Sequence, residues 1–286
     1  MNLYHYCSND VMISIVSKRE IWASDFSLSN DSMEGKWIRE VFSKYCAERG
    51  LSPSYKEMLL PSLDSVISLV GATGFCLSEE ADLLSQWRGY ADNGCGVSIG
   101  FSKEYFEALG RLKRDRNDEF NASLTKIEYD IVRQRELISE NADAILKLVS
   151  EGALWPPTFL TSDEEKKKWQ ASFRTMHWRF LLFFGDIHRF KNPAFAEERE
   201  WRLISHVLPD LGKDQGRQIS GMEFRTRKDR IVPFRRIPLE NIDQAAIIEV
   251  VLGPKNITPE QVVDAVLQKH GWRGIKIRKS SASYRG

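Results

Sequence analysis

The chain has 286 residues, of which 42% are hydrophobic and 28% are charged, and its formal net charge is +1. This length is sufficient for a sizeable hydrophobic core in one large or two small domains. A net charge so close to zero excludes a global field that would steer the chain toward nucleic acid or an anionic membrane.

In chain order, hydrophobic periodicity predicts strands and helices that alternate irregularly. The expected elements are a strand at 3–7, a helix capped by Ser8, a strand at 21–24, helices at 33–49 and 53–70, a strand at 74–77, a helix at 80–91, a strand at 96–101, a helix capped by Ser102, a strand at 126–129, helices at 131–152 and 163–185, strands at 199–206, 222–227, 231–236 and 246–252, a helix at 259–270 and a strand at 274–278. This order, without a G-x-G-x-x-G motif, predicts a mixed α+β fold rather than a Rossmann sheet.

The domain organisation follows from the absence of a linker rich in Pro, Gly or Ser. We expect a single domain over 1–286, within which 103–185 can form a helical insertion. In the helix at 163–185, apolar residues recur at helical spacing and should be core. These residues are Trp169, Phe173, Met176, Phe180 and Phe184.

The cysteine pattern and the N-terminus bear on location. Cys7, Cys46, Cys76 and Cys95 are scattered and form no C-x-x-C motif. The N-terminus lacks the basic and apolar regions of a signal peptide, and no apolar run approaches the roughly 20 residues that span a bilayer. We therefore expect a cytoplasmic protein with no membrane partner.

The most informative stretch is Phe-Ala-Glu-Glu-Arg-Glu-Trp-Arg-Leu at 195–203. On an extended strand, side chains alternate between faces, so Glu198, Glu200 and Arg202 would line one face. The two carboxylates would then lie about 6–7 Å apart, from a rise of roughly 3.3 Å per residue. Such a face can grip sugar hydroxyls and stabilise a developing cation, or it can be the solvated face of an edge strand.

Two polar motifs lie near the N-terminus. His5, beside Tyr6 on the first strand, can bond a ribose hydroxyl or satisfy a backbone carbonyl. The pair Asn30-Asp31 follows the second strand, where it can form an Asx-turn or present an amide and a carboxylate to a ligand.

The predicted helix at 80–91 carries aromatic and polar side chains. Gln86 and Tyr90 share a face at i,i+4 spacing, and Trp87 lies three residues before Tyr90. Such rings can clamp a flat heterocycle or anchor the helix on a sheet. Gly89 in mid-helix costs about 1 kcal/mol relative to alanine, which suggests close packing or a ligand.

A basic segment occupies 213–236, with eight basic and three acidic residues around Phe224 and Phe234. Arginines between aromatic residues are typical of single-stranded nucleic-acid binding. Two solvated strands of a hairpin would have the same composition.

Together these segments resemble the bacterial family known as domain of unknown function 2971. The matching stretches are 3–6, 27–34, 75–78, 86–91, 94–98, 198–202, 250–255 and 281–285. The resemblance therefore runs nearly end to end, but the family name gives no activity.

The order of the motifs is also similar, more distantly, to the ADP-ribosyltransferase fold. This resemblance implies a mostly antiparallel split sheet with helical insertions, and NAD as the substrate. His5 matches the position that contacts the nicotinamide-side ribose, and Ser78 or Tyr90 the position around the nicotinamide. Glu200, with Glu198 as the alternative, matches the catalytic carboxylate that supports an oxocarbenium-like transition state.

The residues expected to bind NAD, including Arg88 as a candidate for the pyrophosphate, are His5, Tyr6, Asn30, Asp31, Ser78, Gln86, Arg88 and Tyr90.

The resemblance implies an NAD-dependent ADP-ribosyltransferase that acts as a bacterial toxin or phage-defence effector. The segment 213–236 favours RNA or DNA over protein as the target, and a toxin would have an antitoxin protein as a partner. Two alternatives remain open. One is a nucleotide or nucleic-acid binding module without catalysis, and the other is a metal-dependent nuclease that uses Glu198, Glu200 and Asp31. No His or Cys ligand spacing indicates a resident metal.

Overall fold

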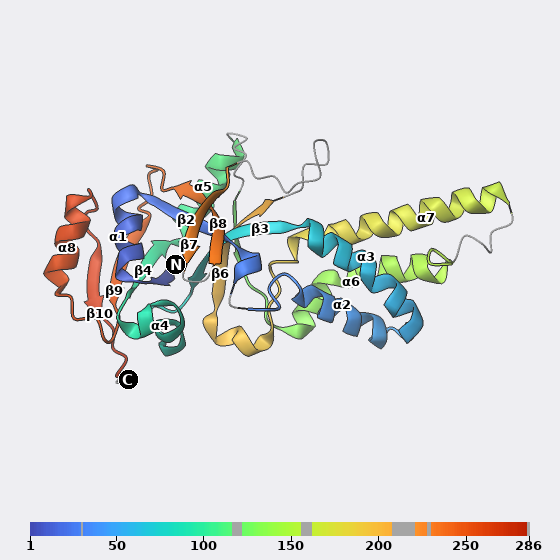
Figure 1. The fold of residues 1–286 in the computed structure, drawn as a ribbon, viewed down its shortest axis with the longest axis horizontal. Coiled ribbons are helices and arrows are strands. Elements are labelled where there is room, and N and C mark those ends of the chain that lie inside the picture. The colour runs from blue at the N-terminus through green and yellow to red at the C-terminus, as the bar shows by residue number, and fades with distance from the viewer. Residues whose placement is uncertain (30, 116–121, 156–161, 208–220, 228–229, 285–286) are drawn as a thin grey trace.

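The structure is a computed structural model that describes residues 1–29, 31–115, 122–155, 162–207, 221–227 and 230–284 (Figure 1). Its helices and strands are β1 (Asn2–Cys7), α1 (Asn9–Lys18), β2 (Glu20–Asp25), α2 (Trp37–Glu48), α3 (Pro53–Leu69), β3 (Gly71–Ser78), α4 (Leu84–Tyr90), β4 (Val97–Ser102), α5 (Lys103–Asp115), β5 (Ser123–Lys126), α6 (Ile131–Ser150), α7 (Asp163–Leu181), β6 (Glu200–Val207), β7 (Glu223–Arg227), β8 (Arg230–Pro238), β9 (Ile247–Leu252), α8 (Glu260–Lys269) and β10 (Lys276–Lys279). Short 3-10 turns include η1 (Phe26–Leu28), η2 (Asp92–Gly94), η4 (Leu182–Gly185) and η5 (Pro193–Glu198).

The described strands form one open sheet. Its order is β10-β9-β4-β1-β3-β2-β8-β7, while β6 pairs with β3, and β5 with β6. The β9–β10 pair is parallel, and the other pairs of described strands are antiparallel. The expected α+β class with a mostly antiparallel sheet is confirmed.

Strand β3 is the point where the sheet divides. One edge of β3 pairs with β6 over its whole length. The other edge is shared, because β2 pairs opposite Thr73 and Gly74 whereas β1 pairs at Ser78. Between these contacts the imidazole of His5 lies 2.9 Å from the carbonyl oxygen of Cys76. β1 and β2 therefore separate along β3, and a side chain rather than a strand fills part of the gap.

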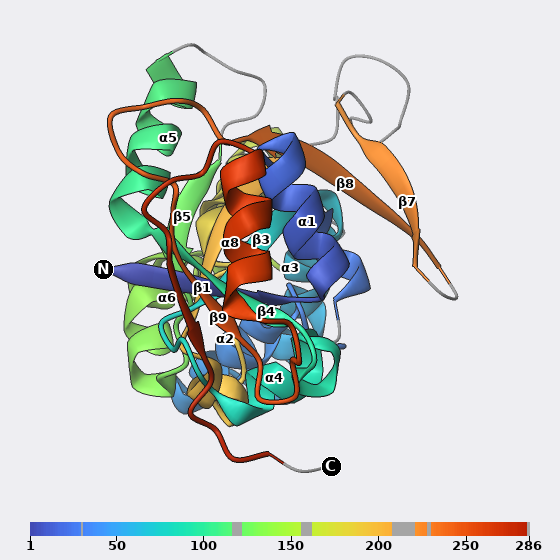
Figure 2. The same ribbon diagram turned by 90° about the vertical axis from the view of Figure 1, so that its left-hand side faces the viewer.

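The main core lies on one face of the sheet, beneath α1, α5 and α8. Alternate strand residues such as Leu3, Phe75 and Ile99 point into it, as the period of two requires. Figure 2 shows α1 and α8 side by side over the strands. The short helix α4 packs through Trp87 in a separate cluster with Tyr6.

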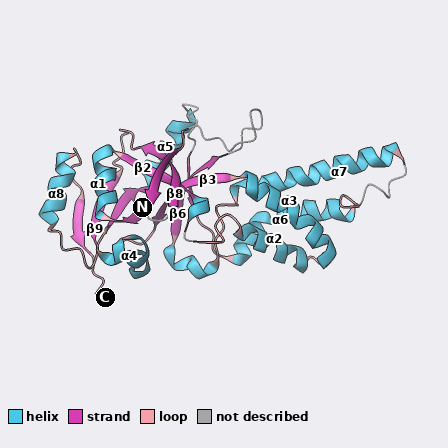
Figure 3. Ribbon diagram, in the orientation of Figure 1, coloured by secondary structure: helices cyan, strands magenta, loops and turns pink. Residues whose placement is uncertain are grey.

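A second core joins α2, α3, α6 and α7 into a helical lobe beside the sheet (Figure 3). In α7, Met176 and Phe180 are fully buried, while Phe173 packs against the same cluster from a partly buried position. The segment 103–185 is divided between the two cores, because α5 and β5 belong to the sheet and α6 and α7 to the lobe. No described helix is long and apolar enough to cross a bilayer.

The strand predicted at 199–206 is confirmed as β6, but it does not extend back to Glu198. Residues Pro193–Glu198 form a 3-10 turn rather than a strand, and Arg199 adopts a left-handed conformation with φ 44°. The side chain of Asn192 caps this turn by accepting a hydrogen bond from the amide of Ala194 at 2.9 Å. The prediction that Glu198 lies on an extended strand was therefore wrong, since β6 begins at Glu200.

Candidate functional site

A buried arginine on β6 organises the charged residues of the site. Arg202 is 2% exposed. Its Nη1 and Nη2 donate to the two carboxylate oxygens of Glu34 at 2.6 and 2.8 Å. Its Nε and Nη2 donate to those of Glu200 at 2.7 and 2.9 Å. One guanidinium thus fixes two carboxylates, one from the segment before α2 and one from the sheet.

Lys191 lies between the two predicted catalytic carboxylates. Its Nζ donates to Glu198 Oε2 at 2.5 Å and to Glu200 Oε2 at 3.0 Å. The fully buried Gln134 of α6 holds the lysine backbone, because its Nε2 donates to the carbonyl oxygens of Lys191 and Glu128 at 2.9 and 2.7 Å. The helical lobe therefore helps to position this ammonium group.

Glu198 is the more accessible of the two carboxylates, with a side chain 13% exposed against 7% for Glu200. Its Oε1 lies 3.4 Å from the hydroxyl of Tyr90. Its carbonyl oxygen accepts a hydrogen bond from Ser78 Oγ at 2.6 Å. Four residues that the sequence singled out, Ser78, Tyr90, Glu198 and Glu200, are therefore neighbours.

The electrostatics distinguish the two glutamates. Burial raises the pKa of Glu198, although Lys191 opposes this shift. Burial would also raise the pKa of Glu200, but Arg202 and Lys191 outweigh it and lower that pKa. Burial would lower the pKa of Lys191, but the two carboxylates outweigh it and raise it. At neutral pH, Lys191 is therefore protonated and Glu200 ionised, and Glu198 is the glutamate that protonates more readily.

His5 lies at the division of the sheet and stacks on Phe75, with ring centroids 4.1 Å apart. Burial lowers its pKa to about 4, so the imidazole is neutral at pH 7. Because a carbonyl oxygen only accepts, Nδ1 must donate to Cys76, and Nε2 is left as a hydrogen-bond acceptor. The Cys76 side chain is exposed, and this residue pairs opposite Arg202.

Other predicted ligand-binding residues serve the fold. The hydroxyl of Tyr6 donates to the carbonyl oxygen of Glu80 at 2.7 Å and accepts from the amide of Leu83 at 2.9 Å, which fixes the segment before α4. Asp31 Oδ1 accepts from the amide of Met33 at 2.9 Å, which is the Asx-turn alternative.

Glu34, Lys191, Glu198, Glu200 and Arg202 form the buried charged group of this site. The remaining predicted residues are not part of it. Gln86 is buried in α4, whereas Arg88 is exposed on it. Asn30 lies outside the described residues. Gly89 is not closely packed, because a Cβ added there would meet nothing within 4 Å.

Sequence reasoning missed Glu34 and Lys191 as parts of the site and used Arg202 only as a strand residue. A signal was present for two of them, since Glu34 closes the matching stretch 27–34 and Arg202 closes 198–202. No pattern marks Lys191, which lies between the 3-10 turns η4 and η5.

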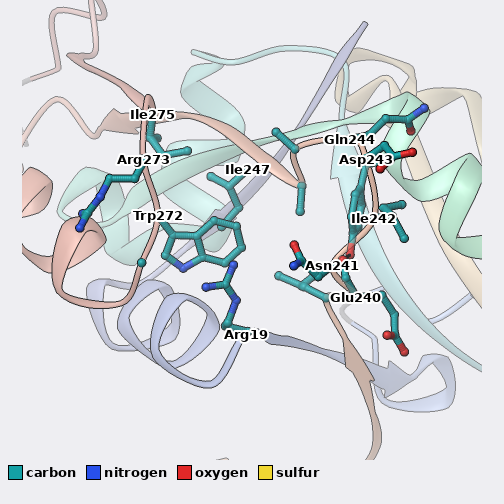
Figure 4. Close-up of a pocket in the computed structure, with 15 residues that line it drawn as sticks. Arg19, Glu240, Asn241, Ile242, Asp243, Gln244, Ile247, Trp272, Arg273 and Ile275 are labelled. Carbon is teal, nitrogen blue, oxygen red and sulfur yellow. Dashed lines mark hydrogen bonds between the residues drawn. The ribbon is translucent and has the colours of Figure 1, made fainter.

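The pocket in Figure 4 lies elsewhere in the molecule. It has a volume of 180 Å³ and lies between the segment 239–247 and the turn 271–275. The guanidinium of Arg19 stacks over the ring of Trp272 there at 4.3 Å. No residue of the buried charged group lines this pocket. Within the described ranges, no group of three or more His, Cys, Asp or Glu residues could hold a metal ion.

Comparison with known proteins supports the first of the two resemblances. Residues 86–203 match the model of a family described as protein of unknown function (DUF2971). This range contains Tyr90, Lys191, Glu198, Glu200 and Arg202, so most of the charged group falls within it. No match was found among curated proteins or among solved structures.

Proposed function

We propose that this protein is an NAD-dependent ADP-ribosyltransferase with a split sheet of that type. In this proposal it acts in the cytoplasm as a toxin or phage-defence effector, and a nucleic acid is the favoured acceptor. The observation that carries the proposal is the Glu198 carboxylate, which is held by Lys191 and faces the hydroxyl of Tyr90 beside the division of the sheet.

The chemistry needs a carboxylate of this kind. Cleavage of the N-glycosidic bond of NAD leaves positive charge on the ribose. A fixed carboxylate in a site with little water stabilises that charge more in the transition state than in the ground state. The neutral imidazole of His5, through Nε2, can accept a hydrogen bond from a ribose hydroxyl.

The two glutamates take different roles in this proposal. Both oxygens of Glu200 already accept hydrogen bonds from Arg202, and Oε2 also accepts one from Lys191. Glu198 Oε1 has a single long contact to Tyr90. We therefore assign the ribose contact to Glu198 and a positioning role to Glu200, which reverses the order of preference that the sequence suggested.

The geometry disfavours the nuclease alternative. A two-carboxylate metal site requires a cation between the carboxylates. The ammonium of Lys191 occupies that place between Glu198 and Glu200.

The test is the release of nicotinamide from NAD by purified protein, with and without RNA, DNA and protein as acceptors. Glu198→Gln should reduce release by roughly 100-fold or more, the usual effect of removing one electrostatic contact to the transition state. Glu197→Gln is the matched control, because Glu197 is exposed on the same 3-10 turn.

Each result has a defined reading. Release that depends on an acceptor and is lost in Glu198→Gln but not in Glu197→Gln supports the proposal. Binding of NAD without release under any condition contradicts it and favours the non-catalytic binding module. Cleavage of RNA or DNA that requires Mg²⁺ and stops on chelation would instead identify a nuclease.

A further inference from the structure

Arg225 of β7 lies on the face of the sheet that carries Trp22 and Ser24 of β2. Its guanidinium stacks over the rings of Trp22 and Phe234 at 5.3 and 5.7 Å. Its Nη2 donates to Ser24 Oγ at 2.9 Å, while its Nε is buried without a hydrogen-bond partner. Figure 2 shows that β7 and β8 extend as a ribbon away from the helices.

This arginine has no carboxylate partner among the described residues. Burial and the nearby charge of Arg227 lower its pKa, and no acidic group opposes them. By contrast, Arg236 on the adjacent strand pairs with Glu223 at 2.5 Å. A partly buried charge without a counter-ion is unfavourable, and such a position is stabilised when an anion completes it.

Arg225 lies near the proposed catalytic face. Ser24, which it contacts, pairs opposite Gly74 of β3. Cys76, which is exposed, and Ser78 follow on the same face of β3. Because a strand rises about 3.3 Å per residue, Gly74 and Ser78 lie about 13 Å apart. The charge of Arg225 is also felt at His5, where it adds to the effect of burial in lowering the pKa.

The two ends of this stretch of β3 carry opposite chemistry. At one end, Ser78 bonds the backbone of Glu198. At the other end, Ser24 accepts a hydrogen bond from the guanidinium of Arg225, for which the described residues provide no carboxylate. Because the Phe26 ring covers Gly74 on this face, a ligand that reaches both ends would run past His5 rather than over Gly74. It would meet a carboxylate at one end and an anion-binding group at the other. A nucleotide has this polarity, since its ribose can develop positive charge and its phosphates are anionic.

We propose that Arg225, together with the hydroxyl of Ser24, binds a phosphate group of a nucleotide. On the basis of the proposed function, this group is the pyrophosphate of NAD, whose ribose end reaches Glu198. A guanidinium suits this role because its planar fork matches phosphate oxygens in a bidentate manner. Arg88, which the sequence suggested for the pyrophosphate, is exposed on α4.

The test is calorimetric binding of ADP-ribose, adenosine and inorganic pyrophosphate. Arg225→Gln should weaken ADP-ribose binding by about 10- to 100-fold, the loss expected for hydrogen bonds between charged groups, and leave adenosine binding unchanged. Arg227→Gln is the matched control, because Arg227 is an exposed arginine two residues along the same strand. Arg225→Lys keeps the charge and should retain part of the affinity, and near-UV circular dichroism verifies the fold of each variant.

The results separate this inference from the proposed function. Equal ADP-ribose affinity in folded Arg225→Gln and the parent protein overturns the inference and leaves the transferase proposal standing. Arg225-dependent binding of pyrophosphate by a protein that releases no nicotinamide supports the phosphate site and overturns the transferase proposal. Arg225-dependent binding of a single-stranded oligonucleotide without binding of ADP-ribose or pyrophosphate overturns the inference and assigns the arginine to a nucleic-acid surface.

Discussion

Arg202 is the residue on which the buried charges depend. Among the residues that the structure describes, three carboxylates, from Glu34, Glu198 and Glu200, face two cations, Arg202 and Lys191. Because Arg202 holds the pKa of Glu34 at about 2 against the effect of burial, that carboxylate stays ionised at neutral pH. A buried ionic network is favourable only while each charge keeps its partners.

Removal of one partner should therefore be costly. Glu34→Gln leaves Arg202 short of a carboxylate and should lower the free energy of unfolding by about 3–5 kcal/mol. Asp64→Asn, which breaks the exposed Arg39–Asp64 pair in the helical lobe, should change it by no more than about 1 kcal/mol. Urea unfolding at pH 7 measures the free energy of unfolding of both variants. Equal losses would show that the buried network stabilises the protein no more than the exposed pair does.

At the same scale, short-range patterns predicted part of the site. Glu198, Glu200 and Tyr90 stood out in local motifs and Ser78 through the resemblance to the ADP-ribosyltransferase fold, and the structure brings the four together. The contact of Glu34 with Arg202 joins residues 168 positions apart, and no periodicity reports such a contact. Lys191 was missed for a related reason, since a lone lysine in a connecting segment resembles any solvated lysine.

At the scale of elements, most strands and helices followed from periodicity and capping. Ser8 caps α1 and Ser102 bonds the first turn of α5 as predicted. Glu198 was misplaced because alternating charges suggested that the strand extends back to it, although Asn192-Pro193 is a start signal for a helical turn. The left-handed Arg199 then separates Glu198 from the strand while keeping its carboxylate near Glu200.

Two glycines allow a matched test of local packing. A Cβ at Gly74 of β3 would lie 2.0 Å from the Phe26 ring, whereas one at Gly89 of α4 would meet open space. Gly74→Ala should therefore destabilise the protein by about 1–3 kcal/mol through overpacking. Gly89→Ala should stabilise it by up to about 1 kcal/mol through helix propensity. Thermal unfolding of both variants measures the difference, and destabilisation by Gly89→Ala would contradict the open environment.

At the scale of the whole molecule, the buried charges join the helical lobe to the sheet. Gln134 of α6 holds the Lys191 backbone, and Glu34, just before α2, binds Arg202 of β6. The sequence predicted the sheet and the helices separately, but not this arrangement. The lobe combines α2 and α3 with α6 and α7, whose segments are far apart in the chain. Folding of the lobe and formation of the site are therefore coupled.

Two buried histidines and Glu34 determine how the stability of the whole molecule responds to acid. Burial lowers the pKa of His5 and of His206 to about 4, from an ordinary value of 6.5. At these two imidazoles the unfolded chain therefore binds more protons than the folded protein between pH 6.5 and 4, so they lower the free energy of unfolding as the pH falls through this window. Glu34, with a pKa of about 2 against an ordinary 4.5, adds a further loss between pH 4.5 and 2.

Urea unfolding from pH 7.5 to 3 measures this profile. The parent protein should keep its full stability above pH 6.5, lose part of it between pH 6.5 and 4, and lose more below pH 4.5. His206→Leu removes one of the two imidazoles and should flatten the slope in the upper window only. Glu34→Gln should flatten it in the lower window only, because the titrating carboxylate is gone. A parent profile that stays flat from pH 6.5 to 4 would mean that neither imidazole is held neutral by the fold.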